Sequence, residues 1–226
     1  MTDHAEIHAA ILRGLYDETL VGNGPRVLEL TRDGLDTGLT PGSMLFDALI
    51  PSLEEVGARF ERGDFFVPEM LIAGKAMAGA LDVLRPLLAD TGVEQVGTFL
   101  MGTVKGDVHD IGKNLVNIML EGAGFHVIDL GVQVSPEKVV AGVLEHKPDI
   151  VGFSAFLTTT MPMFKANINA LNKAGLRDSV IVMVGGAPVT QEYADAVGAD
   201  GYAADASTAV RRAKELIAAR RATVAV

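Results

Sequence analysis

The residues best able to do chemistry lie in one segment, residues 102–112, with the sequence GTVKGDVHDIG. His109 stands there between Asp107 and Asp110. A histidine that binds a metal through one ring nitrogen usually has its other nitrogen held by an acceptor, often a carboxylate. Asp107, two residues earlier in an extended loop, could be that acceptor. The segment is a candidate metal-binding loop; the alternative is a solvated surface histidine, which is the commoner role of such a residue.

The rest of the chain offers few partners for a bare metal ion at His109. A zinc site needs three or four protein ligands, but the chain has no cysteine, and its other histidines are scattered along the sequence. A lone histidine ligand is more reasonable if a macrocycle supplies the remaining ligands. Gly106 and Gly112 would let the backbone turn tightly and would allow a bulky ligand to approach.

Two later loops carry further candidate residues. Residues 154–160, SAFLTTT, follow an apolar run and are rich in hydroxyl groups. Gly185 and Gly186 follow a second apolar run, VIVMV. Paired glycines at the end of a strand allow backbone contact with a ligand that lies against a sheet. The alternative for the glycine pair is an ordinary tight turn between a strand and a helix.

These loops fall between the elements of an α/β domain. The second half of the chain contains five apolar, β-rich runs: GTFLMGTV, HVIDLG, DIVGFSA, VIVMVGG and GYAA. Helical patterns follow the runs, from about Ile111 to Gly122, from Pro136, from Met161 to Ala174, from Gln191 and from Thr208 to Arg221. The alternation predicts a doubly wound, five-stranded parallel sheet of the flavodoxin or Rossmann-like type, with helices on both faces. Such sheets bind ligands at the carboxyl ends of their strands, where the candidate loops lie.

The first half of the chain shows helical patterns only. Helices are expected from Ala5 to Leu20, from Pro25, from Pro41 and from Val67, which predicts a four-helix bundle with short connections. Pro51 lies inside the third of these patterns and should kink or break that helix.

The change of pattern predicts two domains, a helical bundle over residues 1–90 and an α/β domain over residues 91–226. Residues 85–94, RPLLADTGVE, contain Gly and Pro and are the expected linker.

Composition limits the partners. The chain of 226 residues is 49% apolar, enough for a sizeable core, and its net charge is −10 with no basic cluster. Nucleic acid is therefore not an expected partner, because phosphate binding needs clustered Lys and Arg. No apolar stretch reaches the length of a membrane span, and the polar, acidic N-terminus does not resemble a signal peptide. The expected location is the cytoplasm, with no membrane partner.

Together the motifs resemble the cobalamin-binding domains of the methionine synthase and corrinoid methyltransferase class. The family pattern is Asp-x-His-x-x-Gly, a later Ser-x-Leu, and a Gly-Gly pair further on. In this chain it reads DVHDIG at 107–112, SAF at 154–156 and GG at 185–186. The resemblance extends to the first half, because GDFFVPE at 63–69 matches the motif of the family's four-helix cap. Phe156 stands where the family usually has Leu, a departure that bears on pocket shape.

The resemblance implies a cobalamin (methylcobalamin or a related corrinoid) bound with its own base off the cobalt and with His109 as the lower ligand. Asp107 would hold the His109 ring, and Thr160 would donate to Asp107; protonation of this relay would favour release of the ligand. The other residues implied at the cofactor are Gly106, Val108, Asp110, Ile111, Gly112 and Phe156 around the loop, Ser154, Thr158, Gly185 and Gly186 in a slot for the nucleotide tail, and Phe66 and Met70 over the upper face. A place in the bundle core is an equal alternative for Met70.

The resemblance further implies a carrier that moves a methyl group on cobalt, as do the small corrinoid subunits of methanol, methylamine or methoxy-compound methyltransferase systems. A substrate:corrinoid methyltransferase would load the cobalt, and a second methyltransferase would pass the methyl group to a thiol or a tetrahydrofolate-type acceptor. A reductive activation protein would be a third partner. Such a subunit carries a group for its partner enzymes, and whether it is itself an enzyme stays open. The cap would have to open, with the hinge expected at residues 85–94.

The alternative function is a cobalamin-dependent sensor that regulates transcription. Such sensors usually add a DNA-binding domain and use a Trp of the cap. This chain has no Trp and no basic module, which favours the carrier. An ordinary flavodoxin-like domain would explain neither the cap nor the histidine loop.

Overall fold

The computed structural model describes residues 4–88 and 95–224. The chain forms two compact units, the first made mainly of residues 1–94 and the second mainly of residues 95–226. The prediction that a linker begins at residue 85 is wrong, because the helix that begins at Val67 continues through Pro86 to Leu88. The remainder of that expected linker and hinge, residues 89–94, lies outside the described residues.

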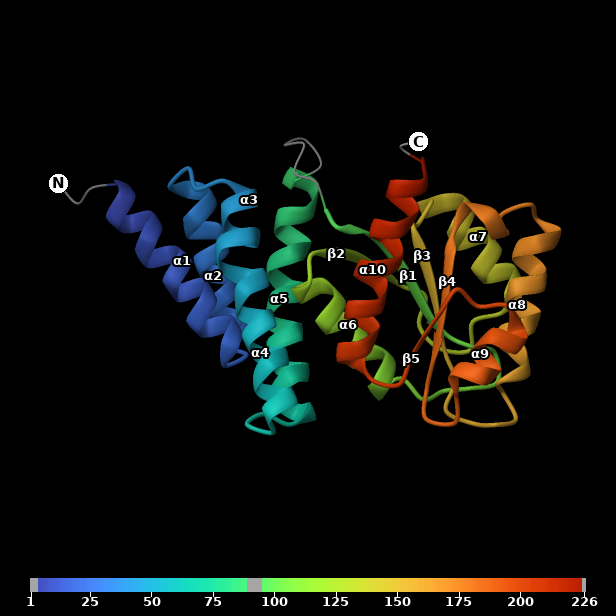
Figure 1. The fold of residues 1–226 in the computed structure, drawn as a ribbon. Coiled ribbons are helices and arrows are strands. Elements are labelled where there is room, and N and C mark those ends of the chain that lie inside the picture. Colours follow the sequence, from blue (N-terminus) through green and yellow to red (C-terminus); the bar gives the residue numbers. More distant parts are fainter. Residues whose placement is uncertain (1–3, 89–94, 225–226) are drawn as a thin grey trace. The chain divides into compact units, whose positions relative to one another are not determined.

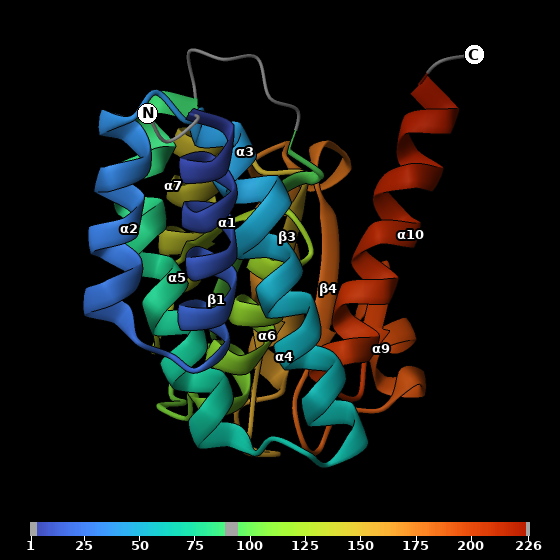
Figure 2. The same cartoon turned by 90° about the vertical axis from the view of Figure 1, so that its left-hand side faces the viewer.

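The first unit is helical, as predicted. Its elements are α1 (His4–Leu20), α2 (Gly24–Asp36), α3 (Pro41–Met44), η1 (Leu45–Leu49), α4 (Ile50–Arg62) and α5 (Val67–Leu88). The segments α3, η1 and α4 follow one another without a break and together form the third of the four predicted helices. Neighbouring helices contact in the pairs α1–α2, α2–α5, α5–α4 and α4–α1, which closes a bundle (Figure 2).

Pro51 changes the helix geometry in the turn that precedes it. Proline has no N–H to donate to the carbonyl of Asp47, and its ring would crowd that carbonyl in a regular helix. The structure accommodates it with a wide π turn at Leu45–Leu49, in which the N–H of Ile50 donates to the carbonyl of Leu45. The helix therefore widens at Pro51 but does not end there, as single π turns in helices do.

Small residues allow the close approach of α5 and α2. Ala73, Ala76 and Ala80 of α5 are buried, and a Cβ added at Gly24 of α2 would lie 3.7 Å from the Cα of Ala76. A larger side chain at either position would push the two helices apart, because protein interiors have no spare volume.

The second unit is a parallel five-stranded sheet with the strand order β2-β1-β3-β4-β5 (Figure 1). Its strands are β1 (Gly97–Thr103), β2 (Phe125–Asp129), β3 (Ile150–Ser154), β4 (Ile181–Gly185) and β5 (Gly201–Ala203). Its helices are α6 (Ile111–Gly122), α7 (Pro136–His146), α8 (Pro162–Lys173), η2 (Arg177–Ser179), α9 (Gln191–Val197) and α10 (Ala206–Val224). Strand order reverses between β1 and β3, so the carboxyl ends of these two strands flank the switch point where such sheets bind ligands.

Alternation along the strands divides the core of this unit between the two faces of the sheet. Leu100, Val151, Phe153, Val182 and Val184 pack with apolar residues of α7, α8 and α9 on one face. Helices α6 and α10 cover the other face (Figure 1). Both faces are buried, which explains why the strand sequences are nearly continuous apolar runs.

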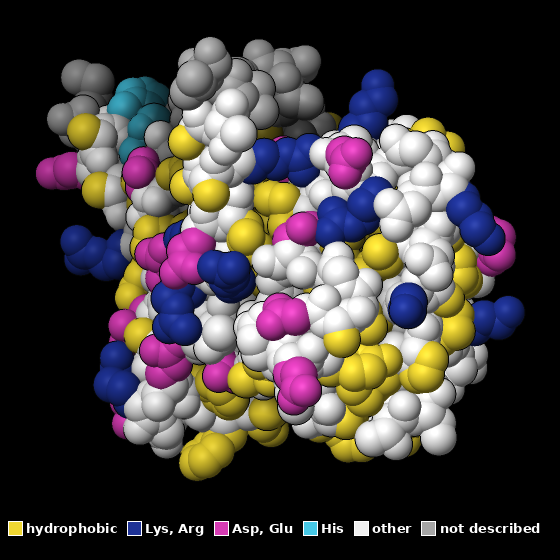
Figure 3. All heavy atoms as spheres, turned by 45° about the vertical axis from the view of Figure 1, so that its right-hand side comes forward, with side chains coloured by type: hydrophobic (Ala, Val, Ile, Leu, Met, Phe, Trp, Pro, Cys, Tyr) yellow, Lys and Arg dark blue, Asp and Glu magenta, His cyan; other side chains and the backbone are white. Residues whose placement is uncertain are grey.

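The surface carries mixed charges. On the face shown in Figure 3, the Lys and Arg side chains are interspersed with Asp and Glu and do not gather into a patch among the residues described there. In the part of the chain that the structure describes, no helix combines the length and apolar character needed to cross a membrane.

Candidate functional site

The candidate site is built by two loops at the carboxyl edge of the sheet. The first loop follows β1 and contains Asp107 and His109; the second follows β3 and runs from Ala155 to Met161. The strands β1 and β3 are paired neighbours, with Thr103 opposite Ser154. This pairing brings together two loops whose hydrogen-bonded residues are 49 to 53 positions apart in the sequence.

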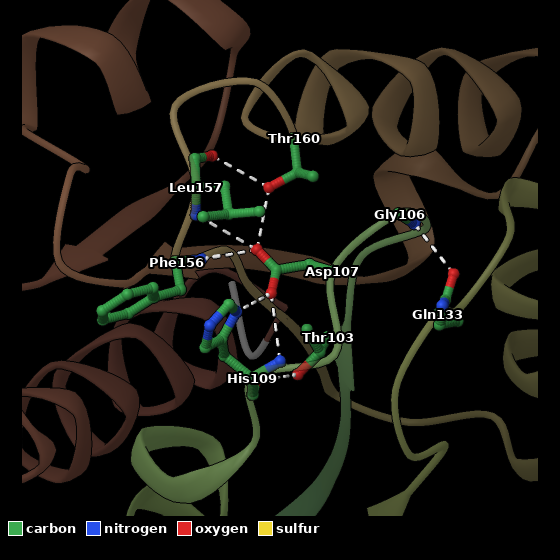
Figure 4. Close-up of polar contacts among 8 residues, drawn as sticks. All are labelled: Thr103, Gly106, Asp107, His109, Gln133, Phe156, Leu157 and Thr160. Atoms are coloured by element: carbon green, nitrogen blue, oxygen red, sulfur yellow. Dashed lines mark hydrogen bonds and ion pairs between the residues drawn. The ribbon is translucent and has the colours of Figure 1, made fainter.

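Asp107 is the centre of the site, and its side chain is completely buried. Its Oδ1 accepts hydrogen bonds from the backbone N–H of His109 at 3.0 Å and from the ring Nδ1 of His109 at 2.7 Å. Its Oδ2 accepts from the backbone N–H groups of Phe156 at 2.8 Å and Leu157 at 3.1 Å, and from the Thr160 hydroxyl at 2.8 Å (Figure 4). One carboxylate thus ties the two loops together.

These donors keep Asp107 ionised. Burial alone would raise the pKa of Asp107, because it disfavours the charged form. The hydrogen bonds from the backbone and ring of His109, from the backbone of Phe156 and from the Thr160 hydroxyl outweigh burial, and the pKa of Asp107 lies well below that of an ordinary aspartate. The carboxylate can therefore act only as an acceptor over the whole physiological range of pH.

An ionised Asp107 determines which His109 nitrogen carries the proton. Because an ionised carboxylate accepts only, Nδ1 of His109 must donate to it. In the neutral ring, Nε2 then bears the lone pair that can bind a metal. The His109 side chain is 46% exposed, so a large ligand can reach it.

The surface around His109 suits a broad apolar ligand. Val108, Ile111, Phe156 and Leu157 all expose a large part of their side chains there, between 40% and 63% of the residue surface. Exposed apolar groups gathered around one polar atom are typical of a binding surface. Across residues 4–88 and 95–224, no three side chains of the His, Cys, Asp and Glu types gather as a set of metal ligands. The donor set therefore fits a macrocycle that needs one axial nitrogen, and it does not fit a bare ion.

The two glycines of the segment 102–112 have different backbone conformations. Gly106 has a φ of +86°, so the tight turn expected there is present. The same expectation is wrong for Gly112, which lies within the first turn of α6 and has no positive φ. A Cβ added at Gly112 would meet no atom within 4 Å, so open space adjoins it. Asp110 directly precedes α6, and its carbonyl accepts from the N–H of Asn114.

The remaining predicted residues fall at different places. Ser154 and Gly185 are the paired last residues of β3 and β4 and are half-buried, and Thr158 is exposed in the second loop. In the helical unit Phe66 is 66% exposed, whereas Met70 is completely buried. The burial of Met70 favours the bundle-core alternative, and the role of Phe66 over a cofactor stays a prediction.

The sequence offers no signal for three residues that support the loops. Gln133 has a positive φ of 56°, unusual outside glycine, and its Oε1 accepts from the N–H of Gly106 at 3.2 Å. The buried hydroxyl of Thr103 donates to the carbonyl of His109 at 3.1 Å. The buried ammonium of Lys113 forms an ion pair with Asp129 at the end of β2. The contacts of Gln133 and Lys113 link groups whose proximity depends on the sheet, whereas the contact of Thr103 lies within the segment 102–112.

The backbone at Gly186 requires a glycine for structural reasons. Its φ is +129°, and an added Cβ would overlap the backbone carbonyl of Ala155 in the neighbouring loop. We expect Gly186→Ala to destabilise the chain by about 3 kcal/mol or more, because both the backbone and the clash oppose it. Gly175→Ala is the matched control, since Gly175 has a φ of +70° but no neighbour within 4 Å, and should cost only about 1 kcal/mol. Equal losses in urea unfolding would show that the clash is relieved without cost.

Comparison with known proteins agrees with this geometry. Residues 97–211 match a family model described as a B12 binding domain, and residues 11–85 match a second model with the same description. The chain is 44% identical to dimethylamine corrinoid protein 1 of Methanosarcina acetivorans over 181 residues, which cover 80% of this chain and 85% of the relative. It is 38% identical to a corrinoid protein of Desulfitobacterium hafniense, over 92% of this chain and 98% of the relative.

Solved structures give the same result. A chain of the methanol:cobalamin methyltransferase complex from Methanosarcina barkeri superimposes with a TM-score of 0.80 at 28% identity, over 92% of this chain and 80% of that one. The monomethylamine corrinoid protein of Methanosarcina barkeri matches with a TM-score of 0.52 at 36% identity, over 92% and 99% of the two chains. The geometry of the site, the family models that match both units and the relatives of similar length agree. This chain belongs to the family of cobalamin-binding corrinoid proteins of methyltransferase systems.

Proposed function

We propose that this chain carries a methyl group on the cobalt of a base-off cobalamin, with Nε2 of His109 as the lower ligand. The observation that carries the proposal is the 2.7 Å contact between His109 Nδ1 and the ionised Asp107, because it leaves Nε2 as the free nitrogen of a ring that a ligand can reach. When bound, the corrinoid supplies a metal that takes up a methyl group and gives it away. The protein's part is to hold and release the axial nitrogen.

The residues behind His109 suit that task. Thr160 Oγ1 lies 2.8 Å from Asp107 Oδ2 and 2.8 Å from the carbonyl oxygen of Leu157. A hydroxyl has one proton and can donate to only one of these acceptors at a time. Donation to Asp107 withdraws negative charge from His109, and donation to Leu157 returns it. Hydrogen bonds behind a metal-binding histidine tune how strongly the histidine binds its metal.

The names of the relatives support methyltransferases as partners. Similar chains include corrinoid proteins for dimethylamine, and one solved relative is part of a methanol:cobalamin methyltransferase complex. We propose that a substrate:corrinoid methyltransferase loads this chain and that a second methyltransferase unloads it to a thiol or tetrahydrofolate-type acceptor. A reductive activation protein would restore the cofactor after accidental oxidation.

The carrier proposal predicts methyl uptake that depends on a partner enzyme. Purified chain loaded with cobalamin and reduced should lose the absorbance of the reduced cobalt when a methylamine- or methanol-specific methyltransferase and its substrate are both present. Omission of either the methyltransferase or the substrate is the control and should leave the spectrum unchanged. The protein would instead be a sensor if no such methyltransferase methylates its cobalt and if, with adenosylcobalamin bound, it changes oligomeric state in light.

A further inference from the structure

His109 has a second neighbour besides Asp107. Its ring stacks on the ring of Phe156, with 4.4 Å between the ring centroids and 30° between the ring planes (Figure 4). A stacked pair at this separation is attractive beyond the apolar area that it buries. The stack joins the first loop to the second through side chains, alongside the backbone contacts through Asp107.

Asp107 alone does not determine the orientation of the imidazole. The second side-chain torsion of histidine has broad minima, and a single hydrogen bond from Nδ1 permits rotation of the ring about the contact. With a side chain that is 46% exposed, His109 lacks the packing that would stop this rotation. A flat surface beside the ring supplies the missing restraint.

Phe156 is itself held in place by the same carboxylate. Its backbone N–H donates to Asp107 Oδ2 at 2.8 Å, while the His109 ring donates to Oδ1 at 2.7 Å. The ring of His109 and the backbone of Phe156 are therefore anchored to the two oxygens of one buried group. Phe156 is 53% exposed, so core packing does not explain why an aromatic residue stands here. A leucine would serve the apolar surface equally well but has no flat face.

We propose that Phe156 is a positioning residue that fixes the plane of the His109 imidazole and so orients Nε2 to serve as an axial ligand of the cobalt. The inference rests on the proposed function of His109. A leucine at this position would offer the His109 ring no flat neighbour, so Phe156 gives this chain a better-organised ligand. Less freedom is then lost when Nε2 binds, which favours the ligated state.

The first test uses the protein without cofactor. Protons of an imidazole stacked on a phenyl ring experience its ring current, so the carbon-bound ring protons of His109 should be shifted upfield in nuclear magnetic resonance spectra. Phe156→Leu should remove that shift, and Phe156→Tyr, which keeps the ring, should preserve it. Leu144→Ala is the matched control, because Leu144 is an exposed apolar residue on α7, and it should leave the shift unchanged. If Phe156→Leu and the wild type give the same shifts, the stack does not exist and the inference is wrong.

The second test uses cobalamin-loaded protein in the cobalt(II) state. Phe156→Leu should lower the ratio of histidine-ligated to unligated cobalt by about twofold to about tenfold, the value of one aromatic pair, and Phe156→Tyr should restore it. Loss of the ring-current shift with an unchanged ratio would overturn the positioning role and leave His109 ligation intact. Absence of any protein nitrogen on the wild-type cobalt would instead overturn the proposed function, and the positioning role with it.

Discussion

His109→Ala is expected to bind cobalamin with no protein nitrogen on the cobalt and to lose methyl transfer by about tenfold to a hundredfold or more, since loss of a residue that merely orients a metal ligand already has effects of that size. His109 supplies the only candidate axial nitrogen that its loop holds beside the exposed apolar residues Val108 and Ile111. The variant should still fold, because a half-exposed loop side chain contributes at most about 1–3 kcal/mol through its hydrogen bond to a charged group.

The measurement is electron paramagnetic resonance of the cobalt(II) protein. Labelling the wild-type protein with nitrogen-15 should change the hyperfine splitting, whereas nitrogen-15 in the cofactor's own base should not. His109→Ala should lose the protein-derived splitting and shift its absorbance towards that of a water-ligated, base-off corrin. His146→Ala, at a partly exposed histidine on α7, is the control and should match the wild type. Splitting that follows the cofactor's base would rule out His109 as ligand.

Asp107→Ala should have the largest effect on stability of any substitution at the site. It would leave the backbone N–H groups of His109, Phe156 and Leu157, and the hydroxyl of Thr160, without the acceptor they share. Removing one partner from such a buried charged network costs about 3–5 kcal/mol. Asp107→Asn should cost less, because its amide oxygen can still accept from part of the set, while its NH₂ group would face donors. Urea unfolding at neutral pH measures the loss of stability in both variants.

Acid unfolding provides an independent check on Asp107. Its pKa is lower in the folded chain than in the unfolded chain, where an aspartate has a pKa of about 3.9. The stability that this difference supplies is fully present above about pH 5 and is lost as the pH falls below about 4 towards the folded pKa. Stability of Asp107→Asn should therefore fall less steeply than that of the wild type over this interval. Asp110→Asn makes the same change three residues along the loop and is the control; identical slopes for wild type and Asp107→Asn would contradict the hydrogen-bond network.

Local patterns in the sequence were enough to predict the helices and strands and the loop that holds the proposed metal ligand. Helical periodicity predicts α1 to α5, because each helix must bury one face. Apolar runs between turn signals predict the five strands, because the sheet of the second unit is buried on both faces. Asp107 and His109 are two residues apart in one loop, so their contact is local and can be read from spacing. The place of the loops at the carboxyl edge follows from the parallel sheet that the alternation predicts.

The contacts behind and beside that ligand emerge only in the folded sheet. Spacing cannot show that Phe156, Leu157 and Thr160 reach the carboxylate of Asp107, and only the family resemblance implies Thr160. Those contacts, the stack of Phe156 on His109 and the approach of Gly186 to Ala155 all depend on the pairing of β1, β3 and β4. Pairing in a parallel sheet joins segments separated by whole helices, and its register comes from the packing of both faces together. The local sequence does not specify that register, so the orientation of His109 is a property of the assembled sheet.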